Sequence, residues 1–193
     1  MARRKYQFRP DPTDSGIWNK LYITPRQRRS IAKWGLYGLV CLGMLILQEA
    51  FLSRVRLFGG FLDLTPCAII MICVLEGVEK GSVFAFAASL VYVFSGSAPD
   101  TLCIGLITVC ATLVTLFREQ FLRRSFGSTL LCTGGAMLAY ELTVALVGVF
   151  FGLTYPGRIG VFALSAGLTL VSVPLLYRLL NIIGRIGGET WKE

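Results

Sequence analysis

The chain has 193 residues, of which 54% are hydrophobic and only 16% are charged, and its mean hydropathy is +0.67. Soluble proteins average roughly 45–50% apolar and about 25% charged residues, so a soluble core of this size could not bury such long apolar runs. With no His and no C-x-x-C, zinc ligation and a His-based catalytic triad are excluded. The net charge of +8 does not predict nucleic-acid binding, because Lys and Arg flank the apolar runs and act as a topology signal.

Residues 1–33 are predicted to form a basic cytoplasmic tail with nine Lys or Arg residues. The tail is too long and too charged for the n-region of a cleaved signal peptide, so the first apolar run is expected to remain in the membrane as an anchor. Anionic lipid would attract the tail with about 1 kcal/mol for each Lys or Arg near the surface. Trp18 and Tyr22 have helix-like spacing for lying on the membrane, whereas Pro10, Pro12 and Pro25 favour a disordered tether.

The apolar runs predict six transmembrane helices, since about 20 helical residues cross a hydrocarbon core of roughly 30 Å. In chain order they are 32–52, 62–75, 81–95, 101–117, 128–152 and 159–181. The second and third are short, which leaves open a re-entrant hairpin. Such a hairpin would bury Glu76, Glu79 and Lys80, at about 2.5–3.5 kcal/mol for each charge near the centre, so two tilted full spans are favoured.

The distribution of cationic residues predicts the orientation. With six spans and both termini inside, sixteen of the nineteen Lys and Arg residues are cytoplasmic, and only Arg54, Arg56 and Arg158 lie outside. The predicted fold class is therefore all-α: a polytopic membrane helix bundle, N-in and C-in. Its transmembrane domain covers residues 34–182, and residues 183–193 form a cytoplasmic C-terminal tail.

Glu141 lies near the middle of the fifth predicted span, with no Lys or Arg inside a neighbouring span. Desolvation favours a protonated carboxyl there, either as a substrate or proton site or as a polar contact that holds helices together. The structural interpretation is favoured, with partners Gln48 or a threonine of span four. The threonines in question are Thr108, Thr112 and Thr115.

Other candidate residues have simpler interpretations. Asp63, Arg54 and Arg56 gather with Asp100 and Arg158 at the outer face, where surface ion pairs are expected. Small residues at helix-packing spacing, namely Gly148 and Gly152, Ala85 and Ser89, and Gly134 with Gly135, predict close helix contacts. The six Cys residues are expected to be buried apolar groups. No nucleotide-binding, nucleophile-elbow or zinc-protease motif is present, so neither catalysis nor a cofactor is expected.

From Gln48 onward the chain resembles the rod shape-determining protein MreD family. The residues that carry the resemblance are Gln48 late in span one, Gly60, Asp63 and Leu64 in the outer loop, the turn Glu76–Gly81, Ser95–Gly96, Gly105, and the basic loop REQFLRR. The match covers residues 36–180. Two positions differ from the family: Leu62 replaces a Pro before the loop Asp, and Tyr92 replaces an acidic residue before the Ser-Gly pair.

The resemblance implies a non-enzymatic scaffold of the peptidoglycan-synthesising cell-elongation complex in the bacterial inner membrane. Its implied partners are the bitopic protein MreC, a RodA-type polymerase with its penicillin-binding transpeptidase, and indirectly MreB filaments. The alternative is the substrate-binding component of an energy-coupling-factor vitamin transporter, which also has about six spans. That alternative needs a polar cavity open to the outer face, for which Glu141, Gln48 and Glu49 are the candidate lining residues.

Overall fold

The computed structural model describes residues 25–51, 60, 62–96, 98, 101–122 and 125–186, with the side chains of residues 25–27, 185 and 186 excepted. The structured elements in these ranges are helices, and none of the ranges forms a β-strand. In chain order they are α1 (Pro25–Ala50), α2 (Leu64–Glu76), α3 (Val78–Phe94), α4 (Leu102–Phe121), α5 (Phe126–Phe150), the short η3 (Pro156–Arg158) and α6 (Ile159–Ile186).

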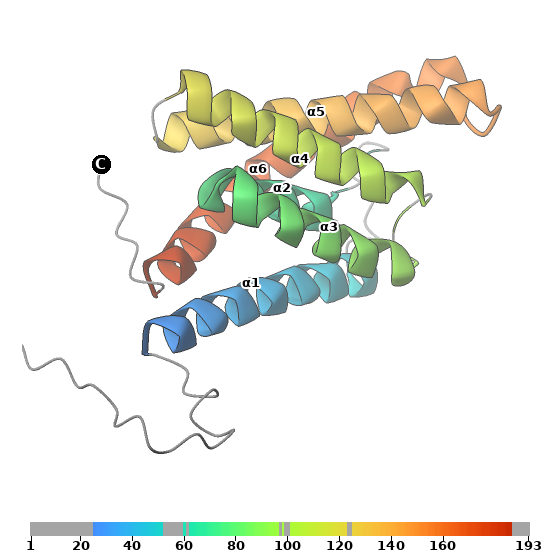
Figure 1. Cartoon of the computed structure of the whole chain (residues 1–193). Helices are drawn as coiled ribbons and strands as arrows, with labels where there is room; N and C mark the ends of the chain where they lie inside the picture. Colours follow the sequence, from blue (N-terminus) through green and yellow to red (C-terminus); the bar gives the residue numbers. More distant parts are fainter. Residues whose placement is uncertain are drawn as a thin grey trace, which may run out of the picture.

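The six α-helices alternate in direction along the bundle (Figure 1). The start of α1, the α2–α3 turn, the α4–α5 turn and the end of α6 lie at one end of the bundle. Helix α2 contacts all five of the other α-helices and is the central element. The fold is thus an all-helical bundle built around one short helix.

Helix α2 is buried on every side, from Leu64 to Leu75. Its sequence, LTPCAIIMICVLE, carries no charge before Glu76 and has no polar face, which is typical of a helix at the centre of a bundle. With 13 residues it is only about 20 Å long, so it is shorter than a hydrocarbon core of roughly 30 Å. Helix α2 is therefore too short to cross such a core, and at least one of its ends lies at the depth of the hydrocarbon instead of at the membrane surface.

The helices around α2 each present a stripe of buried residues at a spacing of three or four, as expected for one face of a helix. On α3 the stripe consists of Gly81, Ala85, Ser89 and Tyr92. On α4 it consists of Cys103, Ile107, Ala111, Thr115 and Arg118. The prediction that Ala85 and Ser89 pack against a neighbouring helix is confirmed, since both are fully buried and the Ser89 hydroxyl lies 3.5 Å from the Ile104 carbonyl.

Glycines make the tight turn between α2 and α3. Gly77 has φ +95°, a conformation that L residues with a side chain rarely adopt. At Gly81 a Cβ atom would lie 2.8 Å from the Cα atom of Cys73, so α3 approaches the backbone of α2 directly. The EGVEKG segment is therefore a helix hairpin that a larger residue would force apart.

Four of the described helical segments are long and apolar enough to cross a membrane: Arg28–Ala50, Leu102–Phe121, Phe126–Phe150 and Pro156–Gly184. Helices α2 and α3, with 13 and 17 residues, coincide with the two short predicted spans. The largest differences from the predicted boundaries are at the two ends of the bundle. Helix α1 begins at Pro25, inside the predicted tail of residues 1–33, and α6 continues to Ile186, inside the predicted tail of residues 183–193.

Gly148 and Gly152 were predicted to form a close contact between helices, but the structure places them in a turn. A Cβ atom on Gly148 would lie 2.7 Å from the Thr154 hydroxyl, and the Gly148 carbonyl accepts hydrogen bonds from the Leu153 and Thr154 amides. Gly152 is exposed and has φ +70°. Both glycines therefore belong to the turn that ends α5, instead of a helix–helix contact. Gly134, where a Cβ atom would lie 2.8 Å from Leu170 of α6, does pack between helices.

Candidate functional site

The N-terminus of α2 is capped by a side chain from another helix. The Gln48 Oε1 atom on α1 accepts hydrogen bonds from the Thr65 amide (3.0 Å) and the Thr65 hydroxyl (2.8 Å). The Gln48 Nε2 atom donates to Asp63 Oδ1 at 2.7 Å. Asp63 itself makes no side-chain cap bond, so Gln48 supplies the acceptor that the free amides of a helix start require.

Helix α6 also contacts the chain at the start of α2. The Asp63 amide donates to the Thr169 hydroxyl at 3.1 Å, and that hydroxyl donates in turn to the Ser165 carbonyl at 2.8 Å. Gly60 lies beside this contact, where a Cβ atom would come within 3.2 Å of the Ser165 hydroxyl. The chain entering α2 is therefore fixed against α1 and α6 by polar contacts inside the bundle.

Glu141 of α5 also lies at the start of α2, next to Asp63. Its carboxyl lies within hydrogen-bonding reach of the Asp63 carboxyl, and its side chain is 1% exposed. The Tyr92 hydroxyl of α3 also lies next to Asp63 and Gln48. Across the described part of the chain, neither Glu141 Oε1 nor the Tyr92 hydroxyl makes a hydrogen bond of normal geometry.

We call these residues the carboxyl cluster: Gln48, Asp63, Thr65, Tyr92, Glu141 and Thr169. The cluster lies well away from the end of α5 and the start of α6. Glu141 is nine residues from the end of α5 at Phe150, or about 14 Å, and Thr169 is ten residues from the start of α6 at Ile159, or about 15 Å. The α5–α6 hairpin accordingly extends past the neighbouring helix ends (Figure 1).

Among the residues that the structure describes, neither predicted partner forms a hydrogen bond with Glu141. Gln48 bonds to Asp63 and Thr65 instead, and the three threonines of α4 each donate to the carbonyl four residues earlier. The prediction that Asp63 makes surface ion pairs is wrong: Asp63 is 5% exposed and bonds to Gln48. Arg54 and Arg56 lie outside the described residues, as does Asp100, and Arg158 is exposed.

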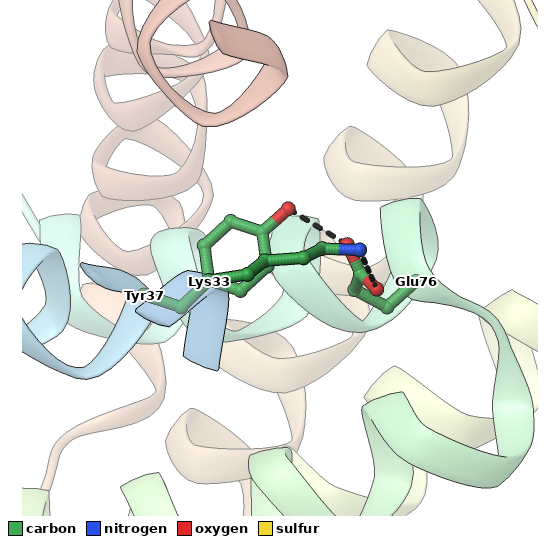
Figure 2. Close-up of polar contacts among 3 residues, drawn as sticks. All are labelled: Lys33, Tyr37 and Glu76. Atoms are coloured by element: carbon green, nitrogen blue, oxygen red, sulfur yellow. Dashed lines mark hydrogen bonds and ion pairs between the residues drawn. The ribbon is translucent and has the colours of Figure 1, made fainter. Parts of the chain in front are cut away.

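A second buried polar network, which was not predicted from the sequence, lies at the other end of α2. Lys33 of α1 forms an ion pair with Glu76 at 2.6 Å, and the Tyr37 hydroxyl donates to the other Glu76 oxygen at 2.7 Å (Figure 2). The Lys33 and Glu76 side chains are only 8% and 4% exposed. The spacing of Lys33 and Tyr37, one helical turn apart, was the available signal.

Residues at the end of α4 complete this second site. Arg118, which is 3% exposed, donates from Nη1 to the Val74 carbonyl in the last turn of α2. Glu119 accepts a hydrogen bond from the Val78 amide at the start of α3. Both ends of α2 are therefore capped by side chains of other helices, as the lack of water inside a membrane bundle requires.

The side chains of the carboxyl cluster can form hydrogen bonds and exchange protons. Within the described ranges no group of three His, Cys, Asp or Glu residues could hold a metal ion. The six Cys residues are free thiols, five of them buried. The cluster does bring together Gln48, Asp63 and Glu141, three of the predicted site residues, from segments far apart in the sequence.

Comparison with known proteins identifies no family: no family pattern, no curated protein and no solved structure matches this chain.

Proposed function

We propose that the protein is a non-enzymatic scaffold of the cell-elongation complex, of the kind that its resemblance to the MreD family implies. The observation that supports this most strongly is where the resembling residues lie. Gln48 and Asp63 bond to each other at the start of α2, and Glu76 is bonded at its end. Gly77 and Gly81 make the α2–α3 hairpin.

Some of the remaining resembling residues also occupy tightly constrained positions. Gly60 packs against α6 at a distance that leaves little room for a side chain. Ser95 donates to the Tyr92 carbonyl, and Gly96 ends α3 with φ +78°. The support comes from the matches at buried or tightly packed positions, because Gly105 and Gly96 are exposed and have nothing within 4 Å of an added Cβ atom. The buried and tightly packed matches support a shared fold, and through it the proposed role.

The departure at Tyr92 has a local explanation under this proposal. Tyr92 faces Asp63, so an acidic residue at this position would place a carboxyl in the carboxyl cluster from α3. In this chain Glu141 supplies a carboxyl to the same place from α5. The cluster therefore keeps two carboxyl groups while the helix that contributes one of them differs.

The proposed topology has six spans with both termini in the cytoplasm of a bacterial inner membrane. In this arrangement the α5–α6 turn is outside and the α4–α5 turn is inside. Gly157 and Gly127 are a matched pair for testing it, since both are exposed and have nothing within 4 Å of an added Cβ atom. In intact cells, a membrane-impermeant thiol reagent is expected to label Gly157→Cys and not Gly127→Cys. Labelling of Gly127→Cys alone would reverse the orientation.

The proposed partner is an MreC-like bitopic protein, which would connect this chain to the polymerase and the transpeptidase. Affinity purification of the tagged full-length chain from native membranes in mild detergent is expected to enrich such a protein, with one span and an outer domain. A protein of similar size with unrelated spans, tagged in the same way, is the control. Enrichment of a cytoplasmic ATPase pair with its coupling subunit would contradict the scaffold and favour the vitamin-transporter alternative.

A further inference from the structure

We propose that Asp63 and Glu141 together bind one proton, carried by Glu141 and shared with an ionised Asp63, so that this proton joins α5 to the start of α2. The proposal concerns a ligand that the scaffold function does not require. It rests on the contacts and burial of the two carboxyl groups.

The Asp63 and Glu141 carboxyl groups are close neighbours. They lie within hydrogen-bonding reach of each other, and both side chains are at least 95% buried. Two carboxylates in such a place repel each other and accept without donating, so no hydrogen bond joins them when both are ionised. One proton turns the same contact into an O–H···O⁻ bond, which is among the stronger hydrogen bonds in proteins.

The shared proton belongs to Glu141, because Asp63 is the better site for the negative charge. Asp63 Oδ1 accepts from Gln48 at 2.7 Å, and Asp63 lies at the N-terminus of the 13-residue α2, where the helix dipole favours a negative charge. Glu141 lies in the middle of α5 and has neither advantage. Its Oε1 atom has no hydrogen-bond partner among the described residues. An unpartnered carbonyl oxygen of a neutral carboxyl costs far less than an unpartnered carboxylate oxygen.

The described groups around the pair are uncharged. The titratable groups that face the cluster within the described ranges are Tyr92 of α3, Cys67 of α2, Cys103 of α4 and Tyr140 of α5. All of them are neutral in their ordinary protonated forms. Helices α1 and α6 contribute Gln48 and Thr169, which do not titrate. The buried cations Lys33 and Arg118 lie at the other end of α2, about 20 Å away along its axis.

The test is infrared spectroscopy of the purified full-length protein at neutral pH, reading the C=O stretch of a protonated carboxylic acid in an apolar environment. The wild-type protein is expected to show this band. Glu141→Gln, which keeps a donor toward Asp63, should lose the band, and Asp63→Asn should retain it. Isotope-edited spectra of the wild type, with carbon-13 in glutamate or in aspartate, make the same assignment without any substitution. Only the glutamate label is expected to shift the band.

Each other outcome overturns the proposal. A band that shifts with labelled aspartate, or survives in Glu141→Gln, would place the proton elsewhere. A wild-type protein without the band would show that both carboxyls are ionised. In that case, appearance of the band in the Arg54→Ala/Arg56→Ala variant would identify an arginine as the countercharge, and its appearance on removal of Na⁺ would identify a bound alkali cation.

Discussion

Replacing Lys33 with Met is expected to destabilise the protein by about 3–5 kcal/mol, because it leaves the Glu76 carboxylate buried without a cation. The two side chains are in contact at 2.6 Å and are only 8% and 4% exposed. Tyr37 continues to donate one hydrogen bond to Glu76, but a single neutral donor does not replace the ion pair. The measurement is thermal unfolding in detergent, together with the amount of protein in the membrane.

The control for this prediction is the double variant Lys33→Met/Glu76→Gln. Removing both charges eliminates the uncompensated carboxylate and keeps an acceptor for Tyr37, so most of the lost stability should return. Glu79→Gln, an exposed carboxyl in the same hairpin, should change the free energy of unfolding by less than about 0.5 kcal/mol. Equal melting temperatures for Lys33→Met and the double variant would show that the pair is not buried in the way the structure describes.

The two ends of α2 explain why so short a helix can occupy the centre of the bundle. An apolar helix of 13 residues exposes polar backbone groups at both termini, and inside a membrane these groups have no water to bond. Gln48 supplies the acceptor at one end, and Arg118 supplies a donor at the other. Polar residues that look scattered along the sequence thus act together, because they all satisfy the ends of α2.

Composition and hydropathy were sufficient to predict the helical class and the approximate positions of the six α-helices in the described part of the chain, because each apolar run corresponds to one of them. They also identified Glu141 and Gln48 as unusual, since polar groups inside an apolar run stand out in any sequence. Helices α1 and α6 extend beyond residues 34–182, the predicted transmembrane domain, because both continue past the apolar run into charged sequence.

The site could not be predicted as fully, for a physical reason. Asp63 follows a predicted outer loop, and loop residues next to arginines normally form surface ion pairs. Only the depth of α2 within the bundle makes Asp63 a buried residue, and hydropathy does not report depth. The same limit applies to Gly148 and Gly152, because their spacing fits a packing motif and a helix end equally well.

The most direct test of the proposed function is the width of rod-shaped cells after depletion of this protein. The account predicts that depleted cells become rounded or wider, and that expression of the wild-type chain restores the rods. Glu141→Gln should also restore them, since the amide keeps a donor toward Asp63, provided that equal amounts of protein reach the membrane. Depleted cells that keep their width, and whose growth instead depends on a vitamin added to the medium, would contradict the scaffold and favour a transporter.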